Sequence, residues 1–265
     1  MNHVIDLDPD FHPYTGYYTN NIQFETLDFH GGETHFRIVG VNIKPDEKLV
    51  ITQRYNSVKD LFMIILANDA ARRMGFKNIE LILPYFPAAR QDRVCNVGEP
   101  LTLKIFADMI NDCNFDKVTI FCPHSEVTPA LLNNVIIQDE LKYIDRIIDI
   151  ELDKIKGYIA IVKKDTIVKT FNIVCPDAGA GKRVGKIVQH LSTKFINCQF
   201  NLIRCEKVRN VKDGKLEGFF VQSEKLGGHP TIICDDINSM GGTFIGLGVE
   251  LRKKNCGQLM LFTAH

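Results

Sequence analysis

Short apolar runs alternate along the chain with longer stretches in which apolar residues recur at helical spacing. Short runs bounded by turn residues predict buried strands, and the helical spacing predicts helices between them. The predicted strands cover residues 49–53, 79–83, 118–122, 173–175, 200–203, 231–233 and 258–263. The predicted helices cover residues 57–75 and 99–113, a segment that ends near Leu191, and the run from Phe244 to Leu251. Strands that alternate with helices predict an α/β fold with mainly parallel sheets flanked by helices.

The remaining segments divide the chain. Residues 1–20 show no clear period, and residues 26–41 predict a hairpin around two glycines. Two prolines make residues 84–93 a loop. Because the strand–helix rhythm starts again late in the chain, we place a domain boundary between residues 148 and 149, giving domains 1–148 and 149–265. The last predicted strand ends almost at residue 265, so we expect either a short protein or further residues beyond that point.

Composition narrows the class of protein. Lys+Arg and Asp+Glu are equal at 32 each, so the charge gives no reason to expect a nucleic acid or a membrane as partner. No apolar run has the length of a membrane span, and the first residues lack the pattern of a signal peptide. The 8 cysteines form no C-x-x-C pair, which favours reduced thiols in a cytoplasmic protein.

The stretch 231–243 carries the first candidate chemistry. A strand ends in Asp235 and Asp236, and a loop of small residues then leads into a helix. Free N–H groups and the helix dipole make such a helix N-terminus a phosphate site, and the two carboxylates can hold sugar hydroxyls or a hydrated Mg²⁺. The plainer interpretation is a turn in which Ser239 caps the helix and the acids are solvated.

Six motifs occur in a fixed order. They are Phe29…Glu33-Thr34, Pro84-Tyr85-Phe86-Pro87…Ala89-Arg90-Gln91-Asp92-Arg93, Gly98-Glu99-Pro100-Leu101, His124, Pro176-Asp177-Ala178-Gly179…Lys182-Arg183, and Asp235-Asp236…Gly242-Thr243. Together they resemble the ribose-phosphate pyrophosphokinases, also called phosphoribosyl pyrophosphate synthetases. The likeness runs from about Phe24 to His265, and the family's C-terminal segment has no counterpart.

The resemblance implies two phosphoribosyltransferase-type domains, with ATP on the side of residues 1–148 and the sugar phosphate on the side of residues 149–265. It implies transfer of the β,γ-diphosphate of MgATP to the anomeric hydroxyl of ribose 5-phosphate, with release of AMP. Mg²⁺ is the implied cofactor, and a homo-oligomer is the implied assembly.

The resemblance also implies roles for single residues. Phe29 and Glu33 would reach the adenine of a neighbouring subunit. The other implied ATP-binding residues are Arg90, Gln91, Asp92 and His124, of which Arg90 and His124 are also implied to be catalytic. The implied sugar-phosphate residues are Asp177, Asp235, Asp236, Ser239, Met240, Gly241, Gly242 and Thr243. His124 and Asp177 are the implied metal contacts, and Lys207 and Arg209 are implied to be catalytic cations on a mobile loop.

Plainer interpretations stay open for several of these residues. A single His124 after a strand is typical of a core histidine, and Phe29 is equally compatible with the core. Lys207 and Arg209 fit a solvated charged loop over residues 204–215. Lys182 and Arg183 are less easily explained in this way, because cations in a first helical turn oppose the helix dipole unless an anion lies nearby.

The sequence departs from the family pattern at identifiable positions. Cys122 stands where the family usually has a metal-binding aspartate, and a thiol is a poor ligand for Mg²⁺. Ser239, Met240 and Gly241 change the sugar-phosphate loop. Three functions therefore remain open: a pyrophosphokinase acting on ribose 5-phosphate, the same transfer to a larger molecule such as ADP-ribose, and a non-catalytic regulatory homologue.

Overall fold

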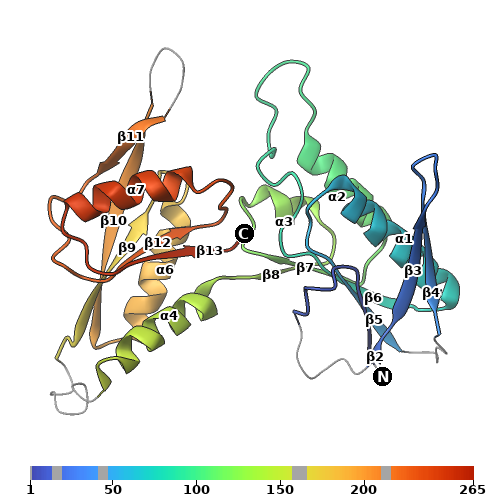
Figure 1. Ribbon diagram of the computed structural model, residues 1–265, viewed down its shortest axis with the longest axis horizontal. Coiled ribbons are helices and arrows are strands. Elements are labelled where there is room, and N and C mark those ends of the chain that lie inside the picture. The colour runs from blue at the N-terminus through green and yellow to red at the C-terminus, as the bar shows by residue number, and fades with distance from the viewer. Residues whose placement is uncertain (1, 14–19, 41–46, 157–165, 210–215) are drawn as a thin grey trace. The chain divides into compact units, whose positions relative to one another are not determined.

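The computed structural model describes residues 2–13, 20–40, 47–156, 166–209 and 216–265. The chain forms two compact units, Met1–Asp139 and Glu140–His265 (Figure 1). The boundary predicted at 148/149 lies inside helix α4 (Leu141–Asp153). Ile144 and Ile148 of this helix are buried in the core of the second unit, so all of α4 belongs to that unit.

A parallel sheet of six strands forms the first unit, in the order β2-β1-β5-β6-β7-β8. Its strands are β1 (Asn2–Asp6), β2 (Asn20–Asn21), β5 (Lys48–Thr52), β6 (Asn78–Ile82), β7 (Lys117–Phe121) and β8 (Val135–Gln138). The helices are α1 (Val58–Met74), α2 (Thr102–Asp112) and the short α3 (Val127–Leu131). The separate hairpin of β3 (Gln23–Asp28) and β4 (Thr34–Val39) confirms the predicted strand pair, and only residue 41 of that prediction lies outside the described residues.

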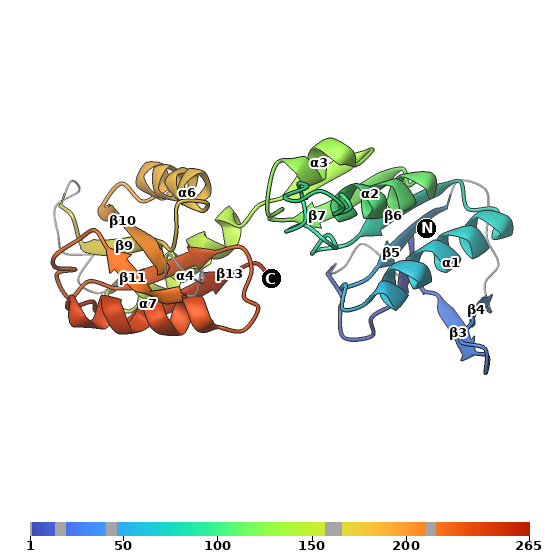
Figure 2. The ribbon, with the colours of Figure 1, turned by 90° about the horizontal axis from the view of Figure 1, so that it is seen from above.

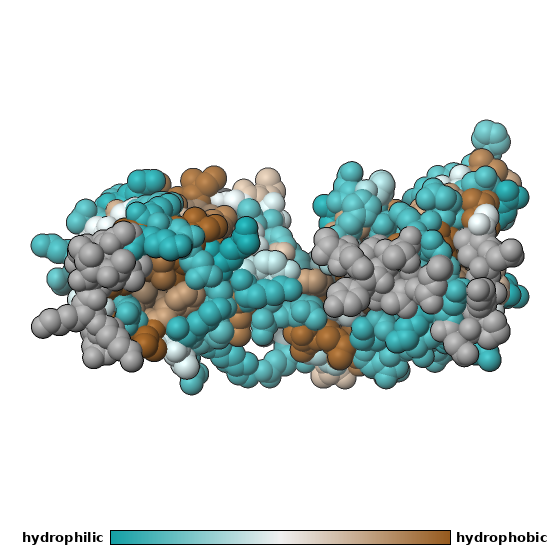
Figure 3. All heavy atoms as spheres, turned by 90° about the horizontal axis from the view of Figure 1, so that it is seen from below, coloured by the Kyte–Doolittle hydropathy of each residue, from teal (hydrophilic) through white to brown (hydrophobic). Residues whose placement is uncertain are grey.

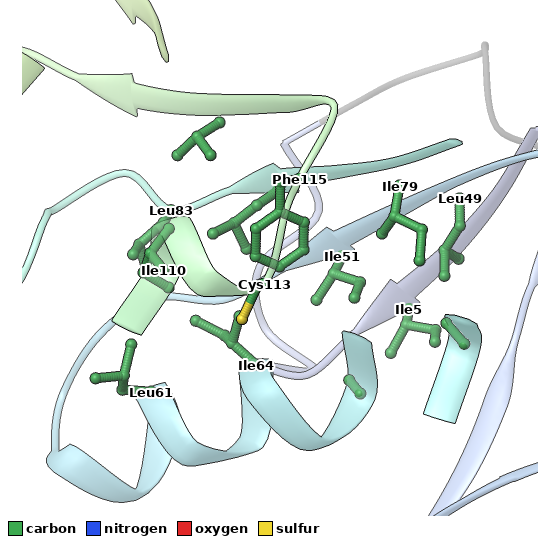
Figure 4. Close-up of a cluster of buried hydrophobic side chains, with 14 of the residues drawn as sticks. Ile5, Leu49, Ile51, Leu61, Ile64, Ile79, Leu83, Ile110, Cys113 and Phe115 are labelled. Carbon is green, nitrogen blue, oxygen red and sulfur yellow. The ribbon is translucent and has the colours of Figure 1, made fainter. Parts of the chain in front are cut away.

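The core of this unit lies where α1 and α2 meet the sheet. Leu61 and Ile64 of α1 and Ile110 of α2 point toward strand residues such as Ile51 and Ile79 (Figure 4). All five side chains are at most 1% exposed. Burial of one such side chain contributes roughly 1.5–3 kcal/mol, so the apolar runs read from the sequence form this core.

Helix α1 begins and ends where the sequence predicts. The backbone N–H of Ser57 donates to the Asp60 carboxylate at 2.6 Å, which is one half of a capping box. Gly75 ends the helix in a left-handed conformation with φ 107°. No element was predicted within residues 1–20, whereas the structure has strand β1 there, which pairs with β5 and buries Val4 and Ile5. Polar residues at both ends of this short strand leave too few consecutive apolar positions for the sequence pattern to indicate it.

The second unit contains a five-stranded sheet in the order β11-β10-β9-β12-β13, with β11 antiparallel to β10 and the other pairs parallel. Its strands are β9 (Lys169–Cys175), β10 (Cys198–Arg209), β11 (Leu216–Val221), β12 (Thr231–Asp235) and β13 (Leu259–Thr263). Helix α6 (Gly181–Lys194) packs on one face together with α4, and α7 (Gly242–Lys253) packs on the other (Figure 2). This mainly parallel, two-sided arrangement confirms the predicted fold class.

One predicted loop in this unit is largely strand. Residues 204–209 of the expected charged loop extend β10, and β11 then pairs back along them. In this segment Cys205 is buried and Val208 is 44% exposed, so the apolar residues show no strand alternation that the sequence could have revealed. Residues 210–215 lie outside the described residues.

The surface is mixed in character. On the face drawn in Figure 3, hydrophobic residues form separate patches among hydrophilic ones. All 8 cysteines are free thiols. Among the described residues, no helix is both long and apolar enough to cross a membrane.

A substitution at Gly257 tests how closely two backbone segments of the second unit pack. A Cβ at this position would lie 2.3 Å from the carbonyl oxygen of Gly228, so the backbone must move to admit any side chain. We expect Gly257→Ala to lower the free energy of unfolding by about 1–3 kcal/mol. Urea unfolding measures this change. Gly185→Ala is the control, because a Cβ inside α6 meets nothing within 4 Å and should stabilise by about 0.5–1 kcal/mol. Equal stabilities of the two variants would contradict the close approach.

Candidate active site

Two adjacent acids mark the carboxyl edge of the sheet in the second unit. Asp235 is the last residue of β12 and Asp236 follows it, and β12 lies between the parallel strands β9 and β13. The carboxyl ends of parallel strands are where open α/β sheets bind ligands. The Nη2 atom of Arg183 lies 3.4 Å from Oδ1 of Asp235 and 4.0 Å from Oδ1 of Asp236. One arginine therefore holds both carboxylates.

Arg183 comes from the first turn of α6, where a cation opposes the helix dipole. Its Nη2 atom also donates to the carbonyl oxygen of Cys234 at 3.4 Å, and its Nε atom lies 3.9 Å from the Glu140 carboxylate. Three carboxylates thus offset the unfavourable position of this cation. The sequence predicted an anion near Lys182 and Arg183, and the carboxylates of the protein itself supply part of that negative charge. Nothing in the sequence indicated that Glu140 would contribute.

The surroundings of Asp235 favour the protonated form of its carboxyl group. Burial raises the pKa of Asp235 to about 6, and the neighbouring Asp236 carboxylate acts in the same direction. The backbone N–H of Asp236, which donates to Asp235 at 3.0 Å, and Arg183 act against this rise in pKa. A ligand that donates hydrogen bonds or carries positive charge will favour the ionised pair.

This raised pKa predicts a pH-dependent stability. Asp235 binds its proton more tightly in the folded state, so the folded state loses stability as the pH rises from about 4 through about 6. Asp235→Asn removes this loss and should stabilise the protein by roughly 1–2 kcal/mol at pH 7, after a discount for solvent screening. At pH 4 and below, the same comparison should show a smaller gain or none.

Urea unfolding at a series of pH values measures this difference. Asp149→Asn, an exposed position on α4, controls for the substitution of an amide for an acid. A gain in stability for Asp235→Asn that is the same at pH 4 and pH 7 would contradict the raised pKa.

Asp177 lies at the same edge, after β9. Its Oδ2 atom accepts a hydrogen bond from Lys207 Nζ at 2.6 Å, and its Oδ1 atom accepts the backbone N–H of Ala180 at 3.2 Å. Burial acts to raise the pKa of Asp177, but Lys207 and the N–H groups of Ala180 and Gly179 outweigh it and hold the pKa below its ordinary value. Asp177 is therefore ionised at neutral pH and can accept hydrogen bonds from hydroxyl groups.

Lys207 is part of strand β10 rather than of a solvated loop. Its side chain is 24% exposed and reaches across to β9 to pair with Asp177. The side chain of Arg209 lies outside the described residues. The structure thus joins one of the two predicted cations to the predicted sugar site.

The loop between β12 and α7 has the geometry of an anion site. Gly241 is the residue before the helix and adopts φ 72°, a conformation that favours glycine, and Gly242 is the first helical residue. Gly241 donates its N–H to the Asn238 side chain at 3.0 Å, so Asn238, and not Ser239, orders this turn. Met240 is 91% exposed. Thr243 follows in the first helical turn.

The residues after β13 brace this loop. The carbonyl oxygen of Asp236 accepts the N–H groups of Ala264 at 3.2 Å and His265 at 2.9 Å. The N–H of Asn238 donates to the carbonyl oxygen of His265 at 2.7 Å. Sequence patterns did not indicate these hydrogen bonds, because they join backbone groups of residues that are far apart in the chain.

In the first unit, the loop after β6 carries Arg90, Gln91 and Asp92. Ala88 turns the loop with φ 57°, and its carbonyl oxygen accepts the N–H of Gln91 at 2.7 Å. The carbonyl oxygen of Gln91 accepts the N–H of Leu103 from α2 at 3.4 Å. Arg90 and Gln91 are exposed. An ordered loop that presents an exposed arginine fits a phosphate ligand.

His124 follows β7, the strand next to β6, and is exposed, so it is not a core histidine. The N–H of Phe121 donates to Pro84 at 2.9 Å, which ties the end of β7 to the start of the Arg90 loop. Cys122 is buried, adopts φ 39° and donates its N–H to Gln138 at 2.9 Å. A left-handed backbone is uncommon for residues other than glycine, asparagine and aspartate, so Cys122 occupies a position whose backbone suits an aspartate.

The β3–β4 hairpin presents Phe29 and Glu33 at its turn. Phe29 donates its N–H to the carbonyl oxygen of Glu33 at 2.8 Å, and its side chain is 51% exposed. The structure therefore rules out a core position for Phe29. Asp28 pairs with Lys59 at 2.5 Å, which fastens the hairpin to the start of α1.

The described residues contain no group of three or more acidic, histidine or cysteine side chains arranged to hold a metal ion by themselves. Mg²⁺ commonly keeps several waters and binds through one or two carboxylates plus substrate phosphates. The exposed His124 and the ionised Asp177 fit this mode in their separate units, and the thiol of Cys122 does not. The metal assignment of His124 and Asp177 stays a prediction.

Comparisons with known proteins address the family. A family model described as the N-terminal domain of ribose phosphate pyrophosphokinase matches residues 15–113. The ribose-phosphate pyrophosphokinase of Pyrococcus abyssi is 25% identical over 93% of this chain and 77% of its own length. The enzyme of that name from Saccharolobus solfataricus is 27% identical over 84% of this chain and 69% of its own length.

A solved structure extends the likeness to the fold. The crystal structure of phosphoribosylpyrophosphate synthetase from Mycobacterium smegmatis matches 92% of this chain and 72% of its own, with a TM-score of 0.65 and 20% identity. The match confirms the predicted two-domain phosphoribosyltransferase-type fold. By its sequence relatives and its fold, this chain is similar to the ribose-phosphate pyrophosphokinases.

Proposed function

We propose that this protein transfers the β,γ-diphosphate of MgATP to the anomeric hydroxyl of ribose 5-phosphate and releases AMP. One observation carries the proposal. Relatives that bear the name ribose-phosphate pyrophosphokinase align with both units, covering up to 93% of the chain. The acids and the glycine loop of the second unit also gather at one sheet edge, where a sugar phosphate needs them.

The second unit would bind the sugar. Asp177, Asp235 and Asp236 accept hydrogen bonds from the ribose hydroxyls, with Arg183 keeping the acid pair in place. The loop from Ser239 to Thr243 receives the 5-phosphate through the N–H groups at the start of α7, since a helix N-terminus favours an anion, while the N–H of Gly241 is held by Asn238. Lys207 leaves Asp177 when the phosphates arrive, and its charge then faces the transferred group.

The first unit would bind ATP. Arg90 lies against the phosphates, with Gln91 and Asp92 beside it and His124 on the neighbouring strand end. Phe29 and Glu33 contact the adenine of a neighbouring subunit, which requires a homo-oligomer. The exposed position of Phe29 on the hairpin supports this role.

The transfer depends mainly on how the protein positions the two substrates. The anomeric oxygen attacks the β-phosphorus in line, the bond from that phosphorus to the oxygen bridging to the α-phosphate breaks, and the hydroxyl proton is released. Bound Mg²⁺ would neutralise charge on the phosphate oxygens, with His124 as the proposed metal contact of the first unit and Asp177 as that of the second. Arg90 and Lys207 stabilise the charge that develops on the transferred and leaving groups.

The altered loop does not favour another acceptor. Ser239 and Met240 are exposed, so their side chains leave the backbone cradle of Gly241 and Gly242 intact. Ribose 5-phosphate is therefore the proposed acceptor in preference to ADP-ribose. The cytoplasm is the proposed location, in keeping with 8 free thiols.

Nucleotide chromatography tests the reaction class. Purified protein with MgATP and ribose 5-phosphate should yield AMP and phosphoribosyl pyrophosphate in equal amounts, with no ADP. A parallel reaction with ADP-ribose should be slower in kcat/KM. ADP as product, or ATP binding without turnover, would contradict the proposal, and the second outcome would indicate a regulatory homologue.

A further inference from the structure

A cavity lies in the first unit, between α1 and α2. Its volume is about 550 Å³, and none of the residues assigned to ATP lines it. Ile65 of α1 and Met109 of α2 provide apolar walls. A volume of this size suits a small organic ligand.

Asn68 of α1 gives the cavity a buried polar group. The residue is 6% exposed, and its Nδ2 atom donates to the carbonyl oxygen of Cys113 at 2.9 Å. Its Oδ1 atom is buried without a hydrogen-bond partner. An unpaired buried acceptor lowers stability, and a donor group on a ligand that displaces the flexible Met109 side chain would satisfy it.

The charged side chains that line the cavity differ in whether another group of the protein pairs with them. Arg72 is engaged with the carbonyl oxygens of Lys77 at 2.6 Å and Asn114 at 2.7 Å. Asp69 pairs with Arg73 at 2.7 Å. Asp112 is therefore the lining carboxylate that has no ion pair within the described part of the chain.

Asp112 also ends α2, where the helix dipole is negative and favours a cation. Helix α1 follows this rule, since Arg72 and Arg73 occupy its last turn. The last turn of α2 contains no basic residue. The C-terminal end of α2 therefore combines an acid with the negative end of the helix dipole and has no basic residue of its own to offset them, as is also true of α4 at Asp153.

We propose that this cavity binds a small amphipathic organic cation, an ammonium or guanidinium group on an apolar body. The charged head lies at Asp112 and the end of α2 and donates to Asn68, while the body packs against Ile65 and Met109. Binding at this site does not depend on the proposed diphosphate transfer, because it is measured without ATP or sugar.

Phenethylamine, agmatine and neutral phenethyl alcohol are the probes, used on the full chain at matched ionic strength. Isothermal titration calorimetry gives the affinity, and the side-chain amide signals of Asn68 in a nitrogen–proton NMR spectrum report the location. Both amines should bind and shift those signals, and the alcohol should bind at least about tenfold more weakly.

Asp112→Asn should weaken amine binding about tenfold while leaving the fold intact. Asp108→Asn is the matched control, because Asp108 lies one turn earlier on α2 and pairs with Lys104 outside the cavity. Equal binding of the amine and the alcohol, or unchanged binding by Asp112→Asn, would overturn the proposal.

Sedimentation velocity separates a free ligand from a side chain of another protein copy. The proposal expects the same sedimentation profile for Asp112→Asn and the unaltered protein. A changed assembly in Asp112→Asn, with no amine bound by the unaltered protein, would show that a basic side chain of a second copy occupies the cavity, and would equally overturn the proposal.

Discussion

Arg90→Ala is expected to slow diphosphate transfer by about 10²–10³-fold in kcat, with a smaller change in the KM for ATP. Arg90 is exposed on a loop that Ala88 and Leu103 hold by backbone hydrogen bonds, so its charge is available to the phosphates. Negative charge on the leaving AMP and the transferred diphosphate grows in the transition state. A cation placed beside that charge therefore lowers the barrier more than it strengthens ground-state binding.

Initial rates of AMP release, measured at saturating ribose 5-phosphate, test this expectation. Arg73→Ala provides the control, because Arg73 is an exposed arginine of the same unit that pairs with Asp69. A kcat within about threefold of the unaltered protein for Arg90→Ala would remove Arg90 from the proposed site.

Asp177→Asn is expected to reduce kcat/KM for ribose 5-phosphate by about a hundredfold. Hydrogen bonds to a charged group contribute about 1.5–3 kcal/mol, and the amide replaces an ionised acceptor with a neutral one. The substitution also leaves Lys207 without its partner at 2.6 Å. Some of the loss then arises from a misplaced cation, so the two contributions must be separated.

A double-mutant cycle with Lys207→Ala performs this separation. If Asp177 acts on the sugar directly, Asp177→Asn should still impair turnover when Lys207 is absent. Calorimetry of ribose 5-phosphate binding supplies a second measurement that does not require turnover. Normal sugar affinity in Asp177→Asn would contradict the assignment of this residue to the sugar site.

The sequence by itself determined most of the fold. Seven predicted strands and the boundaries of α1 agree with the structure, because buried parallel strands require continuous apolar runs and helix ends require capping residues. The sequence also placed Arg90, Asp177 and the acid pair Asp235 and Asp236 at strand ends. Local chemistry specifies such features, since each depends on residues that are neighbours in the chain.

Other elements required the tertiary structure. Strand β1 has too few apolar residues to be recognised, and its position depends on pairing with β5. Strand β11 became visible only as the partner of β10, which turned an expected loop into strand. The core packing of Ile144 and Ile148 likewise assigned α4 to the second unit.

The chemistry of the site shows the same division. Residue types predicted a phosphate and sugar site, but not that Arg183 would hold both acids, that Lys207 would pair with Asp177, or that Ala264 and His265 would brace Asp236. The sequence likewise did not predict that Oδ1 of Asn68 would be buried without a hydrogen-bond partner. Each of these contacts joins positions far apart in sequence, and burial sets the pKa of Asp235, so only the packed chain decides them.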